Sequence, residues 1–258
     1  MSKTTGQSDA SQSGSMAYAS GRSGRFVFPR WANFLLPVMI VAVGGGALYA
    51  PTFAGLALHP DTLNIGYQPE QPVHYSHALH VGQLGMDCKY CHTTVEKAAF
   101  AAVPPTQTCM NCHSNVATAE PTLNKVRESW ATGEPIEWIK IHDLADYSYF
   151  NHSAHVNAGV GCYSCHGRVD QMEVVYQAQP LNMGWCLQCH REPEKFLRPR
   201  EQVTSMTYHL GQGENDLQLK PEDEGSLEKA QLRVGLELKA LYNIKDEAYM
   251  QACSTCHR

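Results

Sequence analysis

The longest apolar stretch of the chain is WANFLLPVMIVAVGGGALYA, residues 31–50, which contains no charged residue. As a helix rising 1.5 Å per residue, about twenty residues cross a hydrocarbon layer of about 30 Å. The residues before it are basic, and the next charge after it is Asp61; the basic residues are Lys3, Arg22, Arg25 and Arg30. The positive-inside rule therefore predicts a single transmembrane anchor at 31–50. It places the N-terminus in the cytoplasm and the rest of the chain in the periplasm or on the outer face of the cytoplasmic membrane.

The segments on either side of this stretch lack apolar periodicity. Residues 1–30 are rich in Ser, Gly and Thr, which predicts a disordered cytoplasmic tail, and the Pro-rich residues 51–73 predict a linker. A cleaved signal peptide is the alternative to a retained anchor. The stretch is long for the apolar region of a signal peptide, and Pro51 disfavours cleavage after Ala50. Both alternatives export the remainder of the chain.

Beyond residue 73 the hydrophobic pattern is weak. Leu227, Val234, Leu238 and Leu241 recur at helical spacing, and Ser226 can cap a helix that runs to about residue 242. We expect this helix to pack on a cofactor core. Residues 191–225 are polar and acidic, which predicts a solvated loop, or alternatively a docking surface for a basic partner. Elsewhere Pro and Gly turn signals predict a mainly α domain with extensive coil.

Composition narrows the function classes. The net charge is −5 and the Lys and Arg residues are scattered, so nothing indicates nucleic-acid binding. The chain contains ten cysteines and 13 histidines. Its apolar content is modest once the anchor is set aside. We therefore expect bound cofactors to supply much of the core, and folding to depend on them.

All ten cysteines fall in five C-x-x-C-H motifs, the attachment signature of a c-type haem. In such a motif the thiols add to the two porphyrin vinyl groups and the histidine binds the iron from one side. The cysteine pairs are Cys88/Cys91, Cys109/Cys112, Cys162/Cys165, Cys186/Cys189 and Cys253/Cys256, and the histidines are His92, His113, His166, His190 and His257. Disulfides would not require a histidine after each pair. Zinc sites would use two pairs each and leave one pair over.

An internal repeat precedes the first and third motifs. YSHALHV at 75–81 and FNHSAHV at 150–156 both read aromatic-x-His-x-x-His-Val, and each is followed by two haem motifs at similar offsets. The repeat predicts a dihaem module with its connector at 74–149 and a second dihaem module at 150–200. Residues 201–258 then contain the C-terminal helix and the fifth motif.

The repeat also supplies spare iron ligands. A low-spin electron-transfer haem needs a second axial ligand, commonly His or Met. Histidines three positions apart lie on one face of a helix and can reach two neighbouring haems. We assign this role to His77, His80, His152 and His155. His142 and Met183 are the candidates for the fifth distal position, and the choice between them stays open; His74 and His209 are weaker candidates.

Three stretches of the chain resemble a known family. The stretches PVHYSHALHVGQLGMDCKYCH, WIKIHDLADYSYFNHSAHV and QPLNMGWCLQCHR resemble the pentahaem cytochrome c subunit of alternative complex III, a bacterial quinol-oxidising assembly. The resemblance implies a class III multihaem cytochrome fold. It also implies an iron–sulfur partner resembling molybdopterin oxidoreductases, polytopic quinol-binding membrane subunits, and a monohaem cytochrome c or terminal oxidase.

We therefore expect an electron-transfer subunit of a membrane respiratory complex that is not catalytic on its own. It would conduct electrons from quinol oxidation through five covalent haems to a cytochrome c or terminal oxidase. A subunit of a related menaquinone-linked reductase complex is one alternative, since sequence does not fix the direction of electron flow. A stand-alone multihaem reductase is another, but a reductase needs an iron with an open position. The spare histidines argue against such a site.

Overall fold

A computed structural model describes residues 29, 31–57, 64–211 and 216–257. The chain divides into two compact units, residues 1–53 and 54–258. We refer to the part of the second unit from residue 64 onward as the head. The tail predicted at 1–30 falls outside the described residues except for Pro29.

The first described element is α1 (Ala32–Ala57), an α-helix long and apolar enough to cross a membrane. It has no buried residue. The helix continues through Pro51, so the first seven residues of the predicted linker are helical instead. Proline lacks the N–H that would bond to the carbonyl of Ala47. One residue on, the hydroxyl of Thr52 donates to the carbonyl of Leu48 at 2.6 Å, next to this break.

The head consists of short helices joined by coil, and its described residues contain no strand, only an isolated bridge between Val160 and Leu197. The mainly α fold class with extensive coil is therefore confirmed. The α-helices are α2 (Cys88–Cys91), α3 (Thr106–His113), α4 (Asn124–Thr132), α5 (His152–Asn157), α6 (Cys162–His166), α7 (Met183–Arg191), α8 (Leu227–Leu241), α9 (Glu247–Met250) and α10 (Cys253–Cys256). One π-helix, η2 (Ala78–Gln83), and the 3-10 turns η3 (Pro121–Leu123), η4 (Val169–Gln171), η5 (Pro193–Lys195), η6 (Arg200–Gln202), η7 (Tyr208–Leu210) and η8 (Pro221–Asp223) complete the set.

The two predicted modules pack against each other in a reciprocal way. The η2 segment of the first module contacts η4 of the second: Ala78 N donates to Met172 O at 3.0 Å. At the start of α5, His152 N donates to Ala99 O at 3.0 Å, in the segment that follows the first motif. A Cβ on Gly82 would come within 2.3 Å of Asp170 O, so the glycine permits the η2–η4 approach. Each repeat segment thus lies against the other module.

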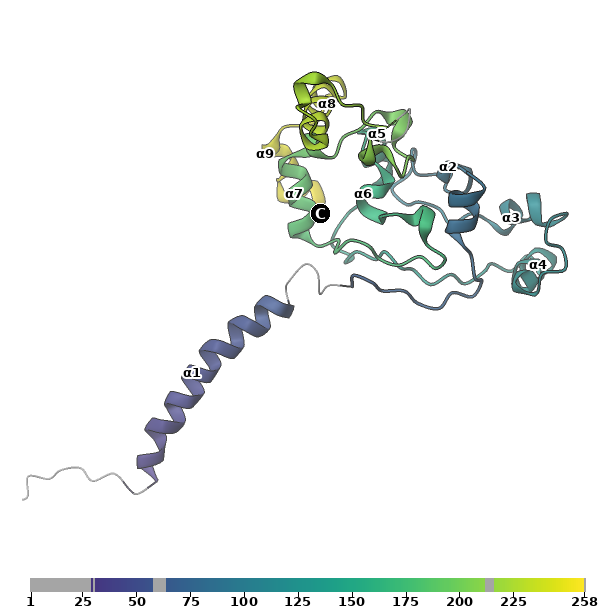
Figure 1. The fold of residues 1–258 in the computed structure, drawn as a ribbon. Coiled ribbons are helices and arrows are strands. Elements are labelled where there is room, and N and C mark those ends of the chain that lie inside the picture. The colour runs from purple at the N-terminus through teal and green to yellow at the C-terminus, as the bar shows by residue number, and fades with distance from the viewer. Residues whose placement is uncertain (1–28, 30, 58–63, 212–215, 258) are drawn as a thin grey trace, which may run out of the picture. The chain divides into compact units, whose positions relative to one another are not determined.

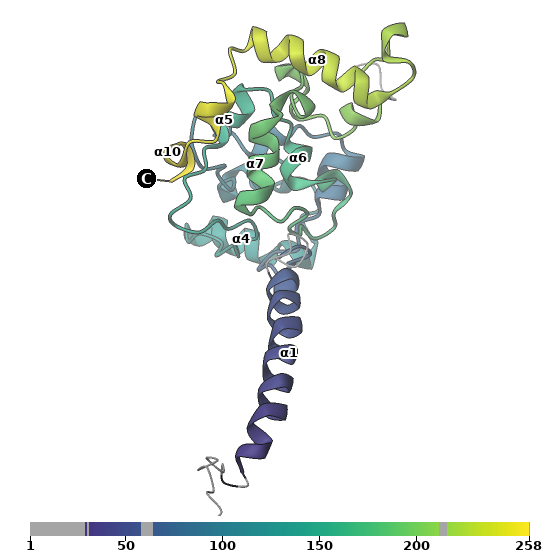
Figure 2. The ribbon, with the colours of Figure 1, turned by 90° about the vertical axis from the view of Figure 1, so that its left-hand side faces the viewer.

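The last long helix, α8, begins at the predicted cap: the Ser226 hydroxyl accepts from Lys229 N. In Figures 1 and 2 it lies along an edge of the head. Its protein contacts are with η5, η7 and η8, and its packing on a cofactor stays a prediction. Gly235 lies so close to η5 that a Cβ would be 1.8 Å from Glu194 O, and Ala230 packs with Tyr208 and Leu217. The buried residues of the helix are Ala230, Gly235 and Leu238, whereas Leu241 is 73 % exposed at the protein's surface.

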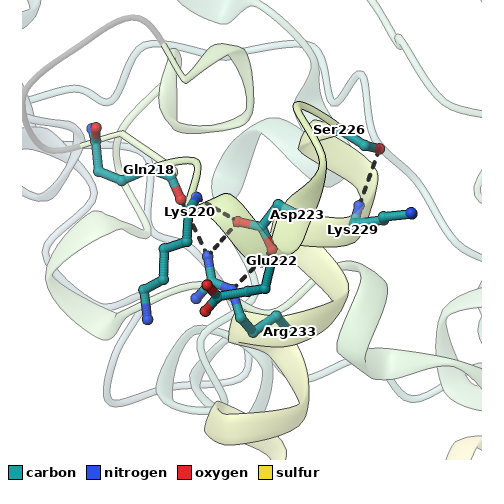
Figure 3. Close-up of polar contacts among 7 residues, drawn as sticks. All are labelled: Gln218, Lys220, Glu222, Asp223, Ser226, Lys229 and Arg233. Carbon is teal, nitrogen blue, oxygen red and sulfur yellow. Dashed lines mark hydrogen bonds and ion pairs between the residues drawn. The ribbon is translucent and has the colours of Figure 1, made fainter.

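An ion pair joins η8 to α8 (Figure 3). The Arg233 guanidinium donates to both carboxylate oxygens of Asp223, Nε at 2.9 Å and Nη2 at 2.8 Å. Asp223 is 1 % exposed, and it also accepts from Lys220 N at 2.7 Å. The solvated loop predicted over 191–225 is therefore wrong for this part, because Asp216 and Asp223 are buried. Charge alone did not distinguish a buried pair from a solvated one.

Candidate haem-binding sites

The five C-x-x-C-H motifs each contain a helical turn. Their cysteines lie within α2, α3, α6, α7 and α10, three positions apart. This spacing places both sulfur atoms of a pair on one face of the turn, with the histidine directly after them. Two of these helices have side-chain caps: Asp87 accepts from Lys89 N before α2, and Asn182 accepts from Trp185 N before α7. The local structure thus presents the groups of each motif as covalent attachment needs.

The two repeat segments place their histidines alike. Tyr75 lies edge-on to His77 with ring centroids 4.7 Å apart and stacks on His80 at 4.4 Å. In the second segment Phe150 lies edge-on to His152 at 4.8 Å and stacks on His155 at 4.5 Å. The backbone differs, since α5 is an α-helix from His152 whereas His77 precedes the π-helix η2. One aromatic ring per module fixes both imidazoles.

Seven candidate ligand histidines form a hydrogen bond between Nδ1 and a backbone carbonyl. A carbonyl only accepts, so Nδ1 must carry the proton and Nε2 keeps a lone pair for a metal. The bonds are His80 to Ser76 O at 2.8 Å, His92 to Ala102 O at 2.9 Å, His113 to Val116 O at 3.2 Å, His152 to Ala99 O at 2.8 Å, His155 to Asn151 O at 2.8 Å, His190 to Met250 O at 2.9 Å and His257 to Tyr147 O at 2.9 Å. These carbonyls hold the rings in a ligating tautomer.

Three pairs of imidazoles stand at the spacing of two axial ligands. Two imidazoles that share one metal ion, each with a metal–nitrogen bond of about 2 Å, hold their ring centroids roughly 6 Å apart. The centroid separations are 6.2 Å for His80–His113, 6.4 Å for His152–His166 and 6.2 Å for His155–His190. In each pair a repeat histidine faces a motif histidine of its own module. The residues present therefore fit iron held between paired imidazoles.

Burial keeps these imidazoles neutral. Burial, followed by the neighbouring His142 and His152, lowers the pKa of His166 to about 3. Burial, with His92 and His80 nearby, lowers the pKa of His77 to about 4. At neutral pH both rings are therefore uncharged, which is the form that binds a metal. The influence of His92 on the pKa of His77 also places the first repeat histidine near the first motif histidine.

His142 and Met183, the two candidates for the fifth distal position, differ in placement. The His142 ring lies edge-on to His166 with centroids only 4.4 Å apart, too short for an iron between opposing nitrogens. Its Nε2 is buried without a hydrogen-bond partner. Met183 is the first residue of α7 and is 62 % exposed. The His257 ring lies tilted to that of Tyr147, with centroids 5.8 Å apart, and the fifth distal ligand stays a prediction.

The remaining histidine candidates are separate from these pairs. His74 is exposed. The His209 ring stacks on Tyr163, the residue after Cys162, with centroids 3.8 Å apart. Among the described residues, no group of three or more His, Cys, Asp or Glu side chains is arranged to hold a metal ion, and the ten cysteines form no disulfide.

Two features of the sites were not predicted from the sequence. The carbonyls that bind Nδ1 lie as far as 110 positions from their histidine, as with Tyr147 and His257. Arg198 is 4 % exposed and donates to Ser205 O at 2.8 Å. A Cβ on Gly161 would come within 2.2 Å of its guanidinium carbon, so a larger residue before Cys162 would displace Arg198. In the sequence, Gly161 directly before Cys162 is the residue that could have indicated this close approach of Arg198.

The chain was also compared with known proteins and protein families. No protein-family model matches the chain. Over 131 residues, 47 % of its length, the chain is 37 % identical to the multihaem cytochrome c subunit of menaquinone reductase from Nitratidesulfovibrio vulgaris. This chain is similar to a multihaem cytochrome c. The match spans 60 % of that relative's length.

Proposed function

We propose that this chain is the electron-transfer subunit of a quinone-linked respiratory complex, with five covalently bound c-type haems. The observation that carries the proposal is the set of paired imidazoles 6.2–6.4 Å apart beside C-x-x-C-H turns. A haem iron with two axial imidazoles, when bound, exchanges one electron without binding a substrate. The similarity to a multihaem cytochrome c subunit supports the same class of function.

The chain's own residues have three roles in this proposal. The motif cysteines bind the porphyrins, the motif and repeat histidines ligate and orient, and the backbone carbonyls at Nδ1 set the histidine tautomer. The apolar helix α1 attaches the head to the cytoplasmic membrane, with the head in the periplasm or on the outer face. None of these groups is an acid, base or nucleophile in the reaction. Quinone chemistry would therefore occur in partner subunits.

Two directions of electron flow have separate support. The resemblance to alternative complex III favours quinol oxidation, with electrons leaving to a monohaem cytochrome c or a terminal oxidase. The name of the relative favours menaquinone reduction. In both cases we expect polytopic quinone-binding subunits and an iron–sulfur subunit in the complex.

The native complex, purified from membranes, tests this function. Its subunits would be identified by mass spectrometry, and the complex assayed for quinol:cytochrome c activity and for menaquinone reduction. We expect co-purification with quinone-binding and iron–sulfur subunits and activity in one direction, which selects between the two. A chain that purifies alone and binds carbon monoxide when reduced would instead support a stand-alone reductase.

A further inference from the structure

We propose that the five attachment sites form one row in the order second, first, third, fourth, fifth, so that the second and fifth motifs are the ends at which electrons enter and leave. This inference rests on the proposed function, because it orders the sites that the function requires. It differs from the order of the motifs along the chain. Four contacts between neighbouring motifs carry it.

The second motif lies beside the first. Asn111, inside the second motif, donates from Nδ2 to the hydroxyl of Tyr90, inside the first, at 3.3 Å. Tyr75 stacks on His80, whose ring faces His113 of the second motif. The Tyr75 ring also lies near cysteines of both motifs, namely Cys88, Cys91 and Cys109.

The first and third motifs meet at their first cysteines. The side chains of Cys88 and Cys162 lie next to each other. A single segment holds the starts of both motifs. Val203 O accepts from Cys162 N at 2.9 Å, and the Thr204 hydroxyl donates to Asp87, the cap of α2, at 2.9 Å. This contact joins the two modules.

Helix α5 connects the third and fourth motifs. Its first histidine, His152, faces His166 of the third motif, and its second, His155, faces His190 of the fourth. The cysteines of the two motifs are also close, since Cys165 lies near Cys189 and Cys186. One short helix thus holds ligands for two adjacent sites.

The fourth motif lies beside the fifth. His190 donates from Nδ1 to Met250 O at 2.9 Å, and Arg191 Nε donates to Gln251 Oε1 at 3.2 Å. Both acceptors lie just before Cys253. Burial, followed by the nearby Cys256 thiol, raises the pKa of Cys186, which places cysteines of these two motifs together.

Exposure of the cysteines agrees with this order. Cys112 of the second motif and Cys253 of the fifth are exposed, whereas the other eight cysteines are partly buried. Figure 1 shows the motif helices across the head as α3, α2, α6 and α7, with the C-terminal end beside α7. The second and fifth motifs are therefore the two ends of the row and the most accessible to partner proteins.

The direct test is the position of each iron in the holoprotein, located by anomalous diffraction at the iron edge and assigned through its histidine. We expect the iron of His92 to lie between those of His113 and His166, and the iron of His190 between those of His166 and His257. An iron of His113 bordering that of His166 more closely than that of His92 would overturn the order. A holoprotein without five covalent haems would instead overturn the proposed function, which keeps the two failures distinguishable.

A second measurement uses electron paramagnetic resonance of the oxidised holoprotein. His80→Ala removes the predicted distal ligand at the second site and should create one high-spin signal there, broadened by a single neighbouring haem. The matched variant His155→Ala places the high-spin signal at the fourth site, where two neighbours should broaden it more. Greater broadening in His80→Ala would place the second site inside the row and contradict the proposal.

Discussion

Two regions of the head are stabilised in different ways. Residues 64–192 contain four haem motifs but only four of the buried apolar side chains, namely Val73, Val126, Val156 and Met172. Residues 193–241 contain no motif, and their described part has seven of them, namely Leu197, Val203, Met206, Tyr208, Leu217, Ala230 and Leu238. The α8 region, residues 193–241, therefore has a side-chain core of its own. The motif region, residues 64–192, leaves that role to its cofactors.

The exposed side chains of the motif region also indicate that its core depends on cofactors. Large apolar residues are exposed there, including Phe100 at 77 % and Trp130 at 52 %. Exposed apolar surface of this kind commonly marks a binding surface. Porphyrins bound at the neighbouring motifs would cover part of it. The difference predicts that cofactor loss and side-chain substitutions will affect the two regions separately.

The largest expected effect follows from preventing haem attachment, by producing the chain without the maturation system for c-type cytochromes. Residues 64–192 should then fail to fold, because they bury too few side chains to offset chain entropy. Hydrogen exchange of the apo and holo chains measures this by segment. Equal hydrogen-exchange protection of residues 64–192 in both forms would contradict the claim that cofactors stabilise this region.

A substitution in the α8 region should destabilise without altering the haem sites. A side chain in Gly235→Val would meet Glu194 O, where a Cβ is already only 1.8 Å away. We expect a loss of about 1–3 kcal/mol from overpacking, with unchanged haem absorption spectra. The control is Leu236→Ala at the exposed neighbouring position, which should cost little. Denaturant unfolding of the two holoproteins gives the comparison, and equal stabilities would count against the helix packing.

The buried ion pair should make this region sensitive to acid. The Arg233 hydrogen bond lowers the pKa of Asp223 from 3.8 to about 2. A carboxyl whose folded-state pKa is lowered stabilises the fold above its unfolded pKa, and this stabilisation is lost as the pH falls through the folded value.

Asp223→Asn should therefore be less stable than the wild type at pH 7, and the gap should narrow between about pH 4 and pH 2. Glu222→Gln, at a carboxylate 3.8 Å from Arg233 Nε, is the control and should change stability less. Midpoints of denaturant unfolding at several pH values measure this. A stability difference that does not change with pH would contradict a lowered pKa of Asp223.

The smallest effect on stability, and the sharpest spectroscopic one, concerns His152 and His142 in the motif region. His152→Ala should leave one haem five-coordinate and reactive with carbon monoxide, because its ring faces His166 at 6.4 Å. His142→Ala should leave the haem at His166 low-spin, because the His142 ring contacts His166 edge-on and does not face it across an iron. If the two variants exchanged these results, His142 would be the ligand.

Some of this architecture follows from sequence and some does not. The motifs, the repeat and the Ser226 cap are local patterns, so the C-x-x-C-H turns, the paired histidines and the start of α8 could be predicted. The fifth distal ligand could not, because it depends on which segment folds back beside His257. The burial of Asp223 was missed for a related reason, since its partner Arg233 lies ten positions away across a turn. Contacts between the modules, such as that of Cys88 with Cys162, leave no local signature.

The central claim is that all five motifs bind haem covalently through both cysteines. Intact-mass measurement of the denatured holoprotein after thiol alkylation tests it most directly. We predict a mass increase of five haems and no alkylated cysteine among the ten. Fewer haems, or alkylation at any motif, would contradict the account.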